Sequence, residues 1–127
     1  MTRIVITKSD SSPWTCPADC QKITTLRLIG GGSGGNGGIR IGSKSYGGLG
    51  GIAGSLTSDT NISVTPGSTY AFSIGAKGSG GCGGNSGGYP NSGTDGGTTT
   101  FLSRSATGGD QSAGVVYPYD GKGGDGA

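Results

Sequence analysis

Short runs in which apolar and polar residues alternate are spread along the whole chain, and long glycine-rich stretches separate them. The alternating runs are Arg3–Thr7, Lys22–Ile29, Asn61–Thr65, Thr69–Gly75, Thr98–Ser103 and Gly114–Tyr117. A two-residue period is that of a strand with one buried and one wet face, which is typical of antiparallel sheets. No window shows the 3.6-residue period of an amphipathic helix. We therefore predict an all-β fold, a small antiparallel β-sandwich resembling a jelly roll, formed as a single domain over residues 1–127.

The apolar positions of these runs define a small predicted core. Pro66-Gly67 is a β-turn pair, so the runs on either side of it are expected to form a hairpin, Val64–Gly75. Leu, Ile, Val and Phe total only 20 of 127 residues. A core of this size is marginal for an isolated domain, so we expect a homo-oligomer. The predicted core residues are Ile4, Ile6, Trp14, Ile23, Leu26, Leu28, Ile62, Val64, Tyr70, Phe72, Ile74 and Phe101.

The 32 glycines recur in a fixed three-residue register. The pattern is clearest in Ser33-Gly-Gly-Asn36-Gly-Gly-Ile39 and in Tyr46-Gly-Gly-Leu49-Gly-Gly-Ile52, and it returns in Ser79-Gly-Gly-Cys82. Three residues per turn is the period of the polyproline-II helix, which has no internal hydrogen bonds. The tracts are therefore either extended polyglycine-II segments that bond to their neighbours, or flexible linkers. The repeated register and the apolar residues within it favour packed segments.

Charge and hydropathy exclude several classes of partner. Nine Lys and Arg residues stand singly and give a net charge of only +2, so we expect no nucleic-acid partner. No segment approaches the roughly 20 apolar residues of a membrane span, and we expect no membrane insertion. The apolar run at 4–6 is followed at once by polar residues, unlike the core of a secretion signal.

Catalytic machinery is not apparent, and we expect a protein that is not an enzyme and has no cofactor or metal. The chain has no His, which excludes Ser–His and Cys–His nucleophile systems. Gly30–Gly35 matches the dinucleotide-binding pattern after a strand, but the next residues, Asn36-Gly37-Gly38, cannot begin the helix that would hold a pyrophosphate. All seven acidic residues are Asp, mostly beside turn-forming residues, and their spacing matches no calcium loop.

Cysteines and tyrosines supply the remaining candidate sites. Cys16 and Cys20 either form a disulfide across a tight turn, if their Cα atoms lie within about 7 Å, or act as two small buried apolar residues. Three thiols without His make a poor zinc site. The candidate exposed aromatic residues on glycine-rich loops, which could alternatively be loop anchors, are Tyr46, Tyr89, Tyr117 and Tyr119. Trp14 is expected in the core or against a turn.

The order of these segments resembles the glycine-rich domain of bacteriophage tail fibres and related virion proteins. The resemblance covers roughly residues 12–110 and rests on five segments in sequence. They are Trp14–Asp19, the strand exit Ile29-Gly-Gly-Gly-Ser-Gly-Gly, Val64–Gly75, Gly96-Gly97-Thr98-Thr99-Thr100-Phe101 and Ala106-Thr107-Gly108-Gly109. Asp19 stands where the family usually has Gly, and Cys16 and Cys20 stand where Val is common. The chain is also similar to phage adhesins with packed polyglycine helices.

The resemblance implies a structural protein exposed on the surface of a virion. A tail-fibre or capsid-surface domain that attaches to the host is the leading expectation, with other virion proteins and a host cell-surface glycan or protein as partners. The alternatives are an architectural cement or decoration protein with no host ligand, and a bacterial glycine-rich surface matrix protein. The family has no catalytic residues to carry over to this chain.

Overall fold

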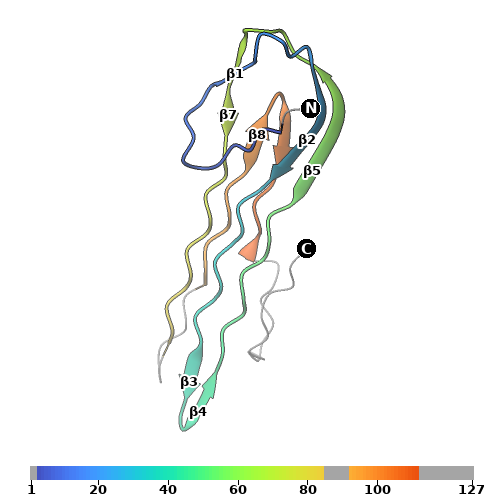
Figure 1. Ribbon diagram of the computed structural model, residues 1–127. Helices are drawn as coiled ribbons and strands as arrows, with labels where there is room; N and C mark the ends of the chain where they lie inside the picture. The colour runs from blue at the N-terminus through green and yellow to red at the C-terminus, as the bar shows by residue number, and fades with distance from the viewer. Residues whose placement is uncertain (1–2, 85–91, 112–127) are drawn as a thin grey trace.

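The computed structural model describes residues 3–84 and 92–111, which form antiparallel strands and no α-helix (Figure 1). The strands are β1 (Trp14–Thr15), β2 (Lys22–Ile29), β3 (Ile39–Ile41), β4 (Lys44–Tyr46), β5 (Leu56–Ser63), β6 (Thr69–Tyr70), β7 (Phe72–Ser73), β8 (Thr99–Phe101) and β9 (Arg104–Ala106). They pair as β1–β6, β2–β5, β3–β4 and β7–β8–β9. The predicted all-β class is confirmed. Within the described ranges no helix could cross a lipid bilayer.

Strands β2 and β5 are the beginning and the end of one long hairpin that includes the first two glycine tracts. The register that pairs Ile29 with Leu56 in β2–β5 continues to Ile39 and Tyr46 in β3–β4. Between the two sheets, backbone hydrogen bonds of 2.8–3.0 Å keep the same register, but they recur every third residue. These bonds run from Gly30 to Ser55, from Ser33 to Ile52 and from Asn36 to Leu49. The chain therefore changes from a two-residue to a three-residue repeat without losing its partner.

Strands β7, β8 and β9 extend into glycine tracts in the same way. The β7–β8 register continues in the bonds Gly97 N to Ala76 O and Thr94 N to Ser79 O, at 2.8 and 2.9 Å. We call residues 30–38 tract 1, 47–55 tract 2, 74–84 tract 3, 92–98 tract 4 and 107–111 tract 5. Figure 1 shows these tracts running side by side, with the longer strands at one end and the β3–β4 hairpin at the other. We call this array the glycine bundle.

The hydrophobic core lies among the strands at one end of the glycine bundle. Leu28 of β2, Phe101 of β8 and Ala106 of β9 form a buried cluster. The rings of Trp14, Tyr70 and Phe101 contact one another, with centroids 5.9–6.4 Å apart. The β2–β5 pair and the β7–β8–β9 sheet thus share one core, which is compatible with the predicted small sandwich.

The predicted strand at Arg3–Thr7 is wrong. The segment pairs with no described strand, and Ile4 is 50% exposed, while Ile6 is half-buried. The chain turns just after it, because the backbone amide of Thr7 donates to the carboxylate of Asp10 at 2.6 Å and the amide of Asp10 returns to the Thr7 carbonyl. Neither isoleucine belongs to the core cluster of Leu28, Phe101 and Ala106 or to the side chains packed against it.

The predicted Val64–Gly75 hairpin is also wrong, although its turn is present. Gly67 has a φ of +78°, and the amide of Ser68 donates to the Thr65 carbonyl at 3.1 Å. The flanking strands pair with other partners: β5 with β2, β6 with β1 and β7 with β8. The link across the turn comes from a side chain, because the Tyr70 hydroxyl accepts the amide of Thr65 at 2.8 Å.

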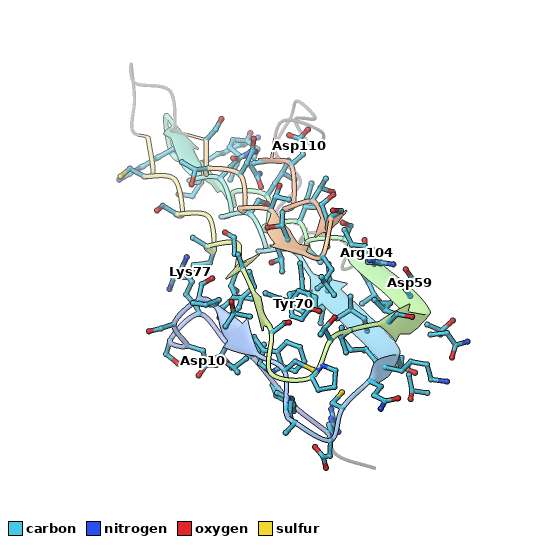
Figure 2. All side chains as sticks on the ribbon, turned by 90° about the horizontal axis from the view of Figure 1, so that it is seen from above. Asp10, Asp59, Tyr70, Lys77, Arg104 and Asp110 are labelled. Atoms are coloured by element: carbon cyan, nitrogen blue, oxygen red, sulfur yellow. The ribbon has the colours of Figure 1, made fainter. Side chains whose placement is uncertain are left out.

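An ion pair joins β5 to β9 at the rim of the core. Arg104 Nε donates to the carboxylate of Asp59, and Arg104 Nη1 donates to the Leu102 carbonyl at 2.8 Å (Figure 2). The hydrogen bond from Arg104, with help from the Thr60 amide, lowers the pKa of Asp59 below its ordinary value. Both side chains are partly exposed, at 32% and 42%, so solvent screens the pair.

We predict an acid-dependent loss of stability from this pair. The pKa of Asp59 is lower in the folded than in the unfolded chain, where it is about 3.9, so the unfolded state binds more protons. The stabilisation is therefore complete above about pH 5 and is lost as pH falls through the folded-state value. In urea unfolding between pH 6 and 3, the free energy of unfolding of Asp59→Asn is expected to fall less with decreasing pH than that of wild type. Asp19→Asn, which removes a carboxylate without a partner in the described chain, is the control and should follow wild type; equal slopes in all three proteins would contradict the assignment.

Candidate binding surface

Tract 1 is the centre of the glycine bundle, and each of its three residue rows faces a different neighbour. The amides of residues 30, 33 and 36 donate to tract 2, and those of residues 31 and 34 donate to tract 4. The carbonyls of residues 32, 35 and 38 accept from tract 3 at 2.7–2.8 Å, and Gly31 O accepts from Gly109 of tract 5. Backbone groups that a polyproline-II helix leaves unpaired are thus paired between tracts.

Close backbone approach explains why the row of residues 31, 34 and 37 is glycine. A Cβ atom on Gly34 would lie closer than 3.0 Å to the Ser79 carbonyl, and one on Gly51 would meet the Ser33 carbonyl in the same way. Equivalent contacts recur every three residues along both tracts, at Gly31 and Gly37 and at Gly48 and Gly54. Glycine costs about 0.5–1 kcal/mol of backbone entropy relative to Ala in regular elements, and here only glycine fits. Packed polyglycine-II segments, and not slack linkers, account for these positions.

A polar cluster around the buried Gln111 connects the tracts in the middle of the glycine bundle. Ser33 Oγ accepts the amide of Ile52 at 2.7 Å and donates to Gln111 Oε1 at 2.9 Å. Gln111 is only 2% exposed, and its backbone amide donates to Asp95 Oδ1 at 2.8 Å. Its Nε2 has no partner among the described residues. The cluster ties tracts 1, 2, 4 and 5 together by side chains, in addition to the backbone bonds between them.

The β3–β4 hairpin forms the tip of the glycine bundle, at the end far from the hydrophobic core (Figure 1). Gly42 has a φ of +61° and is followed by Ser43, which suits a two-residue hairpin turn. Arg40 and Lys44 are exposed, and Tyr46 is half-buried. Arg40 N donates to Gly84 O of tract 3 at 3.2 Å, so the hairpin is bonded to the bundle at its base.

Of the four tyrosines predicted as surface aromatics, the structure describes only Tyr46, which lies in β4 and is half-buried. Tyr89, Tyr117 and Tyr119 lie outside the described residues. Trp14 lies in the aromatic trio of the core, and it also lines a shallow groove of about 270 Å³ with the N-terminal residues Ile4 and Val5.

The two neighbouring cysteines are free thiols in the structure. Cys16 is 1% exposed, its thiol donates to the Cys20 carbonyl at 3.3 Å, and burial raises its pKa. Its backbone joins the Pro66-Gly67 turn, because the Cys16 amide donates to Ser68 and its carbonyl accepts from Gly67. Cys16 thus packs as a small buried apolar residue, and Cys20 is half-buried. The pairing of the two in a disulfide stays a prediction.

No group of three or more His, Cys, Asp or Glu side chains gathers in the part of the chain that the structure describes. Sequence reasoning did not single out the tip cations Arg40 and Lys44, or the buried Gln111. A signal for the tip was available, because Arg40 and Lys44 flank a Gly-Ser turn pair between two short alternating runs. Gln111 has no such signal, since its burial depends on contacts with residues 78 and 16 positions away.

The packing of the tracts predicts that alanine has different effects on stability at two glycines of similar sequence context. Gly34→Ala would force a methyl group against the Ser79 carbonyl and is expected to lower the free energy of unfolding by about 2–3 kcal/mol. Gly80→Ala is the matched control, because its Cβ would have 3.9 Å to the nearest atom, and it should be neutral or stabilise by about 0.5 kcal/mol. Urea denaturation measures both. Similar destabilisation by the two substitutions would contradict the packing of tract 1 against tract 3.

Comparison with known proteins identifies a protein family. A family model described as a glycine-rich domain matches residues 7–127. No curated protein and no solved structure matches the chain. The model covers nearly the whole sequence, including the strands around the core and the tracts of the glycine bundle, and the chain therefore belongs to the glycine-rich domain family.

Proposed function

We propose that this chain is a non-enzymatic structural protein of a bacteriophage virion, exposed on the particle surface as a tail-fibre or capsid-surface domain that attaches to the host. The observation that carries the proposal is the glycine bundle. Tract 1 alone is nine residues long, which at about 3.1 Å per residue spans roughly 28 Å. A backbone-bonded bundle of this length holds the β3–β4 tip away from the hydrophobic core, as a projecting attachment domain requires.

The sequence supports the proposal in two further ways. The order of segments resembles that of tail-fibre glycine-rich domains. The chain has no His, which removes the commonest catalytic base, and this supports a role in binding rather than catalysis. Rigid scaffolds commonly present their binding residues on connecting segments, which here places the contact at the tip.

A second candidate is an architectural cement or decoration protein, favoured by an exposed apolar pair. Ile29 and Leu56 lie opposite each other at the end of β2–β5 and are 66% and 61% exposed. Apolar side chains on one face suit a contact with another virion protein or with a second copy of the chain. This contact is compatible with host attachment through the tip, because the pair lies at the other end of the glycine bundle.

Blocking the tip tests the leading proposal. In a Cys20→Ser, Cys82→Ser background, Ser43→Cys at the tip and Thr25→Cys on exposed β2 each take a maleimide-linked polyethylene glycol. The unmodified protein is expected to bind cells of at least one strain in a bacterial panel. Modification at Ser43→Cys should abolish this binding, and modification at Thr25→Cys should leave it.

Two results would contradict host attachment through the tip. Binding to purified phage particles but to no bacterial strain would favour the cement protein. Cell binding that is retained after modification at Ser43→Cys would show that another surface of the chain makes the contact.

A further inference from the structure

The tip of the glycine bundle carries positive charge that no carboxylate among the described residues lies close enough to offset. Arg40 and Lys44 are the only charged residues between Ile29 and Ser58, and the stretch from Gly78 to Thr94 has none. Both side chains are exposed. Arg40 Nε donates to the Gly42 carbonyl at 3.3 Å, which holds the guanidinium over the turn and leaves its two Nη groups without a partner in the described chain. Lys44 Nζ likewise has none among these residues.

The nearest described acids lie far down the glycine bundle. The bond from Gly34 to Thr94 and the bond from Gly109 to Gly31 place Asp95 and Asp110 near the level of Ser33. Seven residues separate Ser33 from Arg40, a distance of roughly 22 Å at about 3.1 Å per residue. This exceeds the Debye length of about 8 Å at physiological ionic strength, so these carboxylates do not neutralise the tip.

An aromatic ring lies beside one of the cations. Lys44 and Tyr46 are two residues apart in β4, so their side chains lie on the same face of the hairpin. Tyr46 is half-buried. An aromatic ring offers a rigid, amphipathic contact surface, which suits the apolar face of a sugar ring, and an adjacent ammonium group suits an anionic substituent on that sugar.

We infer that the tip binds an acidic glycan, with a sugar ring against Tyr46 and an anionic group paired with Lys44. Arg40 pairs with Ser45 and so starts from the other face of the hairpin, and it reaches the ligand only through the guanidinium that its Nε–Gly42 bond holds at the turn. The inference rests on the proposed function and names the class of ligand for the same tip. A bidentate contact from the free Nη groups of Arg40 would add orientation, while Lys44 would act as a point charge. The contact depends on exposed charges and is therefore sensitive to salt.

Retention on immobilised polygalacturonate, with neutral dextran as reference, tests the inference. Wild type is expected to bind polygalacturonate and not dextran, and to be released as salt is raised from 50 to 500 mM. The double variant Arg40→Gln, Lys44→Gln should bind about five- to tenfold more weakly. Lys22→Gln, Arg27→Gln removes the same charge from exposed positions of β2 and should bind like wild type. Tyr46→Phe should retain binding, and Tyr46→Ala should lose it.

Several outcomes would overturn the inference. Equal weakening by the tip and the β2 double variants would show attraction by net charge alone. Equal retention on dextran would show that the anionic groups of the glycan are not recognised. Binding to anionic phospholipid vesicles but not to polygalacturonate would show that the cations contact a lipid surface. If Arg40→Gln, Lys44→Gln still binds cells while modification at Ser43→Cys blocks them, the proposed function stands and the acidic ligand is wrong.

Discussion

Backbone hydrogen bonds between glycine tracts, repeated every third residue, are the interaction on which the rest of this structure depends. Each tract lacks internal bonds, so its amides and carbonyls must find partners on neighbouring tracts. Tract 1 meets this requirement by donating to tracts 2 and 4 and accepting from tracts 3 and 5. The spacing leaves no room for Cβ on the inner rows, as at Gly34 and Gly51, and this fixes the composition. Glycine is abundant here because backbones approach one another, and the same approach holds the tip in place.

The glycine bundle and the strands are one system, because strand pairs and tracts share their registers. The β2–β5 register continues through tracts 1 and 2 to the β3–β4 tip, and the β7–β8 register continues into tracts 3 and 4. The small aromatic core therefore does not have to order the tracts by itself. It sets the register at one end, and the interlocked backbones carry that register to the other. This arrangement accounts for a long, glycine-rich chain with few apolar residues.

The sequence predicted what depends on local period and missed what depends on distant partners. The alternation of β2 and the three-residue register of tract 1 were readable, because each repeats along its own segment. The first half of β5 could not be predicted from its own sequence, because its inward positions are polar. Thr57 donates to the Ser105 carbonyl, and Asp59 pairs with Arg104. The same limit explains the Val64–Gly75 error, since Pro66-Gly67 fixes a turn but not the partners of the strands beside it. At the tip, Tyr46 was predicted as a surface residue, whereas the lack of a carboxylate partner for Arg40 and Lys44 among the described residues depends on where tracts 4 and 5 place Asp95 and Asp110.

Amide hydrogen exchange, resolved by residue in the native protein, tests the ordered glycine bundle most directly. The account predicts protection with a three-residue pattern in tracts 1 and 3. Ser33, Asn36, Gly78 and Gly81, whose amides donate between tracts, should exchange slowly, and Gly80 and Gly83, which have no backbone partner among the described residues, should exchange fast. Uniformly fast exchange throughout residues 30–54 and 76–84 would show flexible linkers and would contradict the account.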